Sequence, residues 1–387
     1  MVLSGGLVDV NRYDSSVSQD TFAPTAPAQG HALLAYERPN FFVRGYWNRF
    51  TTTGVQAFNP VIAPFLQLSD RNGTSNSLFA SDTFNIDVQH TVQPSESHRI
   101  TYGVSYRHNT VSSNIISEFT RENRLGFVLQ DEWTLSKQWT AVAGVRYDMD
   151  TFINPAVSPR AALIYSFSQD HRIRASGSVA YRPPTPFDEK VLEFVTSSFP
   201  SPAITIQGNR GLAPEQMISY EVEYQGWFLN HRLRLRTDIF FNHMSDLIST
   251  RDQSATLATP INDGGSADIY GGEAGIEFLA TRWLSGFANY TYQEIGQTLT
   301  GRVQRAAPRH KFNFGARAEF ENGINGEILF YHYGSAAYPP GQSFTSLASA
   351  GLVQLPDPRV RQLQPPEHAR RLQVLAAEGR RRLHARR

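Results

Sequence analysis

The feature that most restricts the fold of this chain is an alternation of side-chain character with a period of two residues. In the stretch WTAVAGVRYDMD, residues 139–150, apolar side chains such as Trp139, Val145 and Tyr147 are separated by small, polar or charged residues such as Arg146. This is the period of a β-strand with one face in an apolar medium and the other in a polar one. The apolar medium is either a protein core or a lipid bilayer.

The alternation recurs along most of the chain and predicts an all-β fold. The composition agrees, because 25 Phe and 16 Tyr accompany a charged content of only 18%. No run approaches 18 consecutive apolar residues, so any membrane span must be made of strands. We expect about fifteen strands, near residues 1–13, 31–37, 40–52, 80–93, 98–112, 122–135, 138–152, 158–168, 171–182, 217–229, 231–247, 267–281, 283–296, 309–321 and 324–334.

The connections between these strands alternate between short turns and long polar loops. This rhythm is typical of an antiparallel transmembrane β-barrel, in which tight turns gather at one end and long loops at the other. A soluble β-sandwich or propeller has no reason to place all its long loops at one end. We expect short turns near residues 37–40, 94–97, 135–138, 168–171, 229–231 and 321–325, and the longest loops near 53–79, 183–216 and 248–266.

Arginine on the non-apolar face of the strands favours a barrel over a soluble sandwich, because a wide barrel has a wet, polar interior. We therefore expect lipid outside and water inside. Aromatic residues near strand ends suit the interfacial girdles of such barrels, although aromatics are also common in strands generally. The candidates for a girdle are Trp133, Trp139, Tyr147, Trp227 and Trp283.

The two ends of the sequence carry separate signals. The first residues, MVLSGGLVDV, lack the basic segment and cleavage site of a secretory signal, so the protein is not exported or its true beginning is missing. Residues 341–387 hold nine Arg and three acidic residues. Such a tail in a soluble multi-sheet β protein would indicate nucleic-acid binding, which is the least favoured of three hypotheses.

Four stretches, in order along the chain, resemble the barrel of TonB-dependent outer-membrane receptors. YRPPTPFDE at 181–189 is similar to their arginine-proline segment, and NRGLAPEQMISYEVEYQG at 209–226 to their Asn-x-x-Leu-x-Pro-Glu box. YGGEAGIEF at 270–278 resembles a Gly-x-Glu strand, and APRHKFNFG at 307–315 a Pro-x-His strand opening. The resemblance implies an antiparallel outer-membrane barrel. The weaker strand rhythm extends it to about residues 1–334.

The chain also departs from that family pattern. No TonB box, globular plug or aromatic-ended last strand is visible, and alternation stops after Tyr338. The family barrel has 22 strands, so about fifteen indicate a truncated receptor without its plug. An open sheet in hydrocarbon would leave unpaired backbone edges and should not insert stably alone. We divide the chain into a partial barrel at 1–338 and a basic, irregular, disordered or frameshifted tail at 339–387.

The resemblance implies a receptor and transporter for a scarce nutrient, most plausibly a ferric siderophore, in the bacterial outer membrane. Its partners would be outer-membrane lipid, an iron chelate and, through the missing N-terminal part, an inner-membrane energy-coupling protein; we expect a monomer that binds no nucleic acid. The alternative is a passive porin-like barrel of 14–16 strands. A plug encoded upstream in frame would favour the receptor, and a signal peptide directly before the first strand would favour the porin.

The residues themselves offer little chemistry. No zinc-protease, nucleophile or phosphate-loop motif is present, so we expect no enzyme, no cofactor and no metal site. Glu221 and Glu223 share a strand face and should pair across the next turn with Arg232, Arg234 or Arg236. The candidate ligand-binding or plug-facing residues, with plug contact favoured, are Arg146, Arg174, Tyr181, Arg182 and Arg317.

Overall fold

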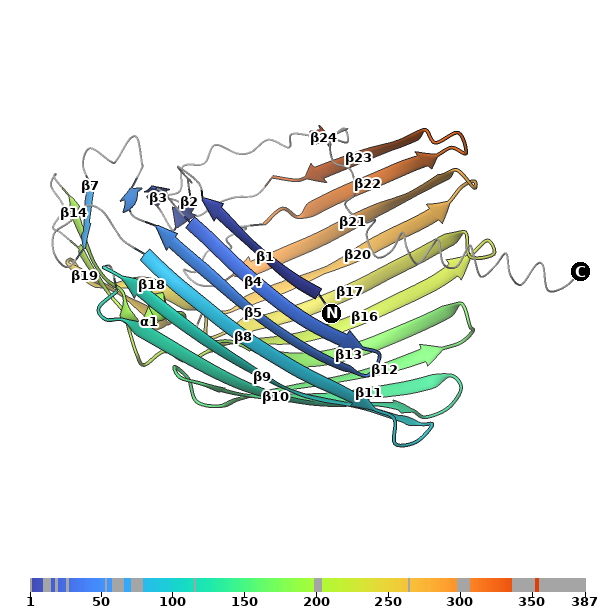
Figure 1. The fold of residues 1–387 in the computed structure, drawn as a ribbon, viewed down its shortest axis with the longest axis horizontal. Coiled ribbons are helices and arrows are strands. Elements are labelled where there is room, and N and C mark those ends of the chain that lie inside the picture. Colours follow the sequence, from blue (N-terminus) through green and yellow to red (C-terminus); the bar gives the residue numbers. More distant parts are fainter. Residues whose placement is uncertain are drawn as a thin grey trace, which may run out of the picture.

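The chain folds into one large curved antiparallel sheet with two small sheets at one end (Figure 1). The computed structural model describes residues 2–9, 15–17, 20–25, 28–52, 54–57, 66–70, 79–114, 116–197, 204–263, 265–297, 307–335 and 352–354.

The large sheet has sixteen strands, each hydrogen-bonded to the next in chain order. Fifteen of them correspond one for one to the strands expected from the sequence, which confirms the all-β antiparallel fold. The strands are β1 (Val2–Asp9), β4 (Ala28–Arg38), β5 (Phe41–Thr52), β8 (Phe79–Val92), β9 (His98–Ser113), β10 (Thr120–Thr134), β11 (Trp139–Asp150), β12 (Ala156–Ser166), β13 (His171–Arg182), β16 (Glu215–Phe228), β17 (Leu233–Ser245), β20 (Ala267–Leu279), β21 (Leu284–Gln297), β22 (His310–Glu319), β23 (Asn325–Tyr333) and β24 (Leu352–Gln354).

The sheet bends so strongly that the blue strands β1, β4 and β5 cross in front of the yellow strands β16 and β17 in Figure 1. Its strand order starts at β1 and finishes at β24, and no pairing joins these two strands in the described part of the chain. The described strands thus form a sheet that is curved like a barrel wall and is not closed. The expected tail at 339–387 lies outside the described residues except for β24, which pairs with Leu329, Phe330 and Tyr331 of β23.

All the expected short turns lie at one end of the sheet, and all the long connections lie at the other. The long connections are not plain loops, as the sequence had suggested, because they contain further regular structure. Strands β7, β14, β15, β18 and β19 form a five-stranded sheet, and β2, β3 and β6 form a three-stranded one. These elements are β2 (Ser15–Val17), β3 (Asp20–Thr25), β6 (Gly54–Ala57), β7 (Leu66–Asp70), α1 (Pro186–Lys190), β14 (Leu192–Ser197), β15 (Ile204–Gln207), β18 (Ile248–Ser254) and β19 (Leu257–Asn262).

The large sheet has an apolar face that no other part of the described chain covers. Large apolar side chains along mid-strand positions remain exposed, as at Ile239 (65%) and Val222 (44%). The best-buried apolar side chains, Ile116 and Val191, instead lie at the loop end, where they form an isolated bridge. A sheet with no protein core against its apolar face fits the barrel rather than the soluble sandwich.

Aromatic rings gather on the apolar face at the turn end of the strands. Trp139 packs on Tyr165 with ring centroids 4.5 Å apart, and Trp283 stacks on Phe320 at 5.1 Å. Trp133 stacks on a histidine of the neighbouring strand at the same end. These rings form the kind of belt that barrels place at a membrane interface.

Trp227 differs from the other candidates for the belt. It stands on the polar face, opposite Arg234, whose guanidinium lies 5.4 Å from the indole centroid. A cation over an aromatic face is a favourable contact, so this ring contributes to packing on the polar face and not to the aromatic belt.

The apolar face has the height of a bilayer core. Along β13 it runs from His171 to Tyr181, ten residues apart. At a rise of ~3.3 Å per residue and a tilt of ~40°, this stretch covers about 25 Å along the barrel axis. Among the described residues, no helix is long and apolar enough to cross a bilayer.

A cation placed in the middle of the apolar face should be costly. We expect Ile239→Arg to destabilise the membrane-assembled form by about 2–4 kcal/mol, the usual penalty for Arg at mid-bilayer on a barrel. The matched control is Ser176→Arg on the polar face beside Glu221. The measurement is the fraction of each protein recovered in the outer membrane. Equal recovery of both variants would contradict the assignment of the two faces.

Candidate functional site: the polar face of the sheet

The polar face carries a dense set of ion pairs, which we treat as the candidate functional site. Arg146 on β11 donates from Nε and Nη2 to both carboxylate oxygens of Asp148, at 2.7 and 2.6 Å. The same Nη2 donates to the hydroxyl of Ser105 on β9, at 2.9 Å. The Arg146 side chain therefore reaches across the whole of β10.

Gly126 makes this reach possible. It lies on β10 between Asp148 on one side and Ser105 on the other. A Cβ atom at this position would collide with the Arg146 guanidinium and stand 2.6 Å from the Asp148 carboxylate. The Arg146 guanidinium fills the space that a side chain at position 126 would occupy. Gly126 was not among the residues expected to form the site, although the sequence places a glycine on the polar face there, between strands that carry charges.

A second arginine network lies nearer the loop end of the same strands. Arg124 bridges Glu122 and Asp150, both at 2.7 Å, and Glu122 and Asp150 are almost fully buried. Arg107 donates to Tyr46 at 2.9 Å and to Asn85 at 3.3 Å. Charge-assisted hydrogen bonds of this kind lock neighbouring strands together.

Arg174 on β13 faces two glutamates on β16. Its Nη1 lies 3.7 Å from Glu221 and 3.8 Å from Glu223. Arg236 on β17 reaches Glu223 as well, at 3.8 Å. The pairing expected for Glu223 with Arg236 is thus present, whereas Arg234 pairs with Glu277 at 3.6 Å.

Three carboxylates stand side by side across adjacent strands on this face. Glu223 is opposite Asp238, and Asp238 is opposite Glu273. Like charges directly opposite each other in a sheet destabilise it. Within the described residues Asp238 and Glu273 form no ion pair, so this acidic row has more negative charge than the sheet itself neutralises.

Arg182 serves the loop end rather than the open polar face. Its Nε donates to Glu215 at 2.5 Å, and the Glu215 side chain is only 6% exposed. The second Glu215 oxygen accepts from the backbone N–H of Ile248 at 2.8 Å. The arginine-proline segment and the Asn-x-x-Leu-x-Pro-Glu box therefore meet through this pair and hold the start of β18.

Asn209, the first residue of that box, ties together the same region. Its side chain accepts from the backbone of Gly211 at 2.9 Å and donates to the carbonyl of Pro260 at 3.1 Å. The box residues thus organise the loop-end sheet.

The structure does not bring all five candidate residues together. Arg317 pairs with Glu319 at 2.6 Å on β22, at the turn end and far along the sheet from β11. Tyr181 is on the opposite face, where its hydroxyl accepts from Gln216 at 2.8 Å. A hollow of about 280 Å³ at the loop end is bordered by Arg124, Arg146, Asp148, Asp150, Ile153, Ala156, Ser158, Ala180, Tyr181 and Pro183.

Helix α1 lies at the loop end of the large sheet (Figure 1). Thr185 caps it and exchanges hydrogen bonds with Asp188, which makes a capping box. Gly208 lies so close to the backbone of Glu189 and Lys190 that no side chain would fit, and its N–H donates to the carbonyl of Val191 at 2.7 Å.

The carboxyl group of Glu189 is the most perturbed acid of the loop end. Its side chain is buried, and Oε1 has no hydrogen-bond partner among the described residues. Burial raises the pKa of Glu189 to about 7; the charge of Lys190 opposes this shift, and that of Asp150 adds to it. Glu118, which pairs with Lys190 at 3.0 Å, has its pKa lowered by that lysine.

Three of the described histidines each lie beside one carboxylate, His98 beside Asp131, His231 beside Asp170 and His243 beside Asp268, all at 2.7 Å. Within the described ranges, no group of three or more His, Cys, Asp or Glu side chains is arranged to hold a metal ion.

Comparison with known proteins assigns the family. Residues 6–356 match the family model described as TonB dependent receptor-like, beta-barrel. The chain belongs to the TonB-dependent receptor family. Members of this family are outer-membrane transport receptors rather than enzymes. Comparison with curated protein sequences gives no match.

Solved structures of such receptors share the fold of this receptor chain. The siderophore receptor PirA from Acinetobacter baumannii has a TM-score of 0.60 at 12% identity, over 86% of this chain and 55% of its own. A variant of the ferric enterobactin receptor PfeA from Pseudomonas aeruginosa gives 0.61 at 14%, over 86% and 52%. The copper transporter OprC gives 0.59 at 13%, over 90% and 58%. The chain spans little more than half the length of these proteins.

Filling the space at Gly126 should break the bridge across β10. We expect Gly126→Val to expel the Arg146 guanidinium and to lower the stability of the receptor by about 1–3 kcal/mol, as other overpacking changes do. Gly45→Ala is the matched control, because a Cβ there has no neighbour nearer than 3.8 Å. The measurement is the urea concentration at which the heat-modifiable, folded band disappears. A Gly126→Val midpoint equal to that of the control would contradict this role.

The buried acid of α1 should make the loop end sensitive to pH. Because the folded state raises the pKa of Glu189 from its ordinary 4.5 to about 7, it holds the proton more tightly than the unfolded segment does. The stabilisation is complete below pH 4.5 and is lost as the pH rises through 7. We expect the free energy needed to open residues 186–197 to fall by about 1–3 kcal/mol between pH 5 and 8. The measurement is amide hydrogen exchange, corrected for intrinsic rates. Glu189→Gln should abolish this dependence; an unchanged dependence in that variant would refute it.

Proposed function

We propose that this chain forms part of the barrel wall of an outer-membrane receptor that imports a ferric siderophore by an energy-coupled mechanism. The observation that carries the proposal is the match of residues 6–356 to the receptor family. Two of the similar structures are named as a siderophore receptor and a ferric enterobactin receptor, which supports the ligand class.

The polar face is better suited to a protein partner than to an anionic chelate. Arg146, Arg174, Arg182 and Arg317 each have a carboxylate of the same sheet within ion-pair distance. An anionic ligand would have to displace these carboxylates, which costs more than binding a free arginine. We therefore propose that Arg146, Arg174 and Arg317 structure the wall of the lumen and that Arg182 structures the loop end.

The acidic row of Glu223, Asp238 and Glu273 supports the same interpretation. Three neighbouring carboxylates on one face call for positive charge from outside the sheet. A plug domain with a basic surface, inside the lumen and coupled to an inner-membrane energy-transducing protein, would supply it. Ligand specificity would then lie at the loop end, where Arg210 borders an open hollow of about 740 Å³.

Deletion of the gene that encodes this chain tests the proposal. We expect the deletion strain to lose most of its uptake of one class of iron-55 siderophore under iron limitation, and a plasmid copy to restore it. A protonophore should abolish uptake in the parent, because the transport requires energy. Uptake that is unchanged by deletion would overturn the receptor proposal, and solute flux through the purified protein without any energy source would instead support the passive porin.

A further inference from the structure

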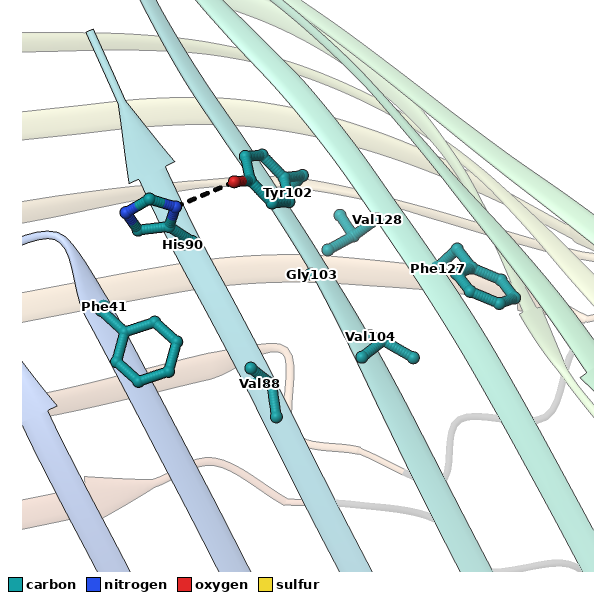
Figure 2. Close-up of a pocket in the computed structure, with 8 residues that line it drawn as sticks. All are labelled: Phe41, Val88, His90, Tyr102, Gly103, Val104, Phe127 and Val128. Carbon is teal, nitrogen blue, oxygen red and sulfur yellow. Dashed lines mark hydrogen bonds between the residues drawn. The ribbon is translucent and has the colours of Figure 1, made fainter.

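The apolar face of the sheet contains a hollow of about 580 Å³ near the turn end of four adjacent strands (Figure 2). This volume is within the usual range of small-molecule sites. The lining residues come from β5, β8, β9 and β10 and are almost all apolar or aromatic: Phe41, Val88, His90, Tyr102, Gly103, Val104, Phe127 and Val128. The function proposed above makes no use of this hollow.

The hollow exists because short side chains lie between aromatic rings. Val88 stands opposite Val104, and Val104 stands opposite Phe127, so two branched aliphatic residues form a low floor beside a ring. The neighbouring row toward the turns holds Phe41, His90 and Tyr102, as Figure 2 shows. The rings therefore bound the floor on two sides.

The row of rings toward the turns is polar at its edge. His90 Nδ1 and the Tyr102 hydroxyl are 2.9 Å apart, and their rings meet edge to face at 5.5 Å. Phe41 packs edge to face on the other side of His90, at 6.0 Å. The second nitrogen, Nε2, has no partner in the part of the chain that the structure describes, so it can bond a ligand.

A cation stands beside this polar edge. Arg38, on β4, is directly opposite Phe41 across the first short turn and is exposed. Its Nε donates to the Tyr36 hydroxyl at 2.5 Å, and its two terminal nitrogens have no hydrogen-bond partner among the residues that the structure describes, so they can contact an anion. The hollow thus combines an apolar floor with an anion-attracting rim at the end nearer the turns.

The position of the hollow along the membrane normal indicates which molecule occupies it. The rim is at the end of the strands that carries the aromatic belt, where lipid headgroups meet the hydrocarbon. The short turns of such barrels face the periplasm. A molecule here has its polar end in the periplasmic leaflet and its apolar end toward the bilayer centre.

We propose that this hollow binds one acyl chain of an anionic phospholipid from the periplasmic leaflet. The chain lies on Val88 and Val104 against Phe127, and the phosphate contacts Arg38 and His90 Nε2. The inference rests on the outer-membrane location proposed above but not on the transport of any ligand. A free fatty acid or a lipopolysaccharide in the same place would be a different occupant.

The absence of cysteine from the chain permits a direct test. The full receptor, purified from membranes with Ile86→Cys and labelled with bimane, is reconstituted in vesicles containing a brominated phosphatidylglycerol. Ile86 is exposed on the apolar face two residues from Val88, so the label lies beside the hollow without filling it. Val222→Cys is the matched control, since it is also a branched aliphatic residue, exposed on the same face and six residues from the turn end of its strand. We expect half-maximal quenching at position 86 at about one-fifth or less of the brominated fraction needed at position 222.

Two further variants separate the proposal from its alternatives. Val88→Trp fills the hollow and should bring the position 86 curve onto the control curve. Arg38→Gln should reduce the preference for brominated phosphatidylglycerol over brominated phosphatidylethanolamine by about threefold or more. Coincident curves for 86 and 222 in the parent, or quenching at 86 that fatty acid or lipopolysaccharide displaces but phosphatidylglycerol does not, would overturn the proposal. Outer-membrane fractionation of the same proteins, read separately, reports on the proposed location alone.

Discussion

The pairing of the backbone of each strand with its neighbours is the constraint on which the whole structure depends. In a bilayer, a strand has no water to bond its N–H and C=O groups, so only a sheet that pairs them all is tolerated. The antiparallel ladder meets this demand for the strands between β1 and β24, whereas β1 and β24 are each paired on one side only within the described residues. Alternate side chains of a strand also point to opposite faces, so the register of the strand determines which residues lie on the apolar face and which lie on the polar face.

The polar face shows how such a wall manages charge. The charges of Arg146 and Arg174 are neutralised without a ligand, because each arginine lies beside a carboxylate of its own or the next strand. This arrangement requires space, since the Arg146 guanidinium can cross β10 only because Gly126 has no side chain. The acidic row around Asp238 is the exception, because Asp238 and Glu273 form no ion pair within the described residues.

The sequence allowed the strands and short turns to be predicted because both follow from local chemistry. Period-two alternation and turn residues are readable within about ten positions, and all fifteen long strands were found. The faces of Arg146, Arg174 and Arg317 followed from the same parity. The face of Trp227 was readable in the same way, since it shares the parity of Glu221 and Glu223 on β16, although an interfacial ring was expected there. The small strands β14, β15, β18 and β19, in contrast, have no alternation long enough to detect. The burial of Glu189 depends on Gly208, which is close to it only after folding.

The five-stranded sheet at the loop end joins three connections that are far apart in the chain. β7 pairs with β14, β14 with β15, and β15 runs parallel to β19. Each connection therefore supplies backbone partners for another. In evolution, a change of length in one of them would disturb the register of the other two, so these three surface segments should diversify together among related receptors rather than one at a time.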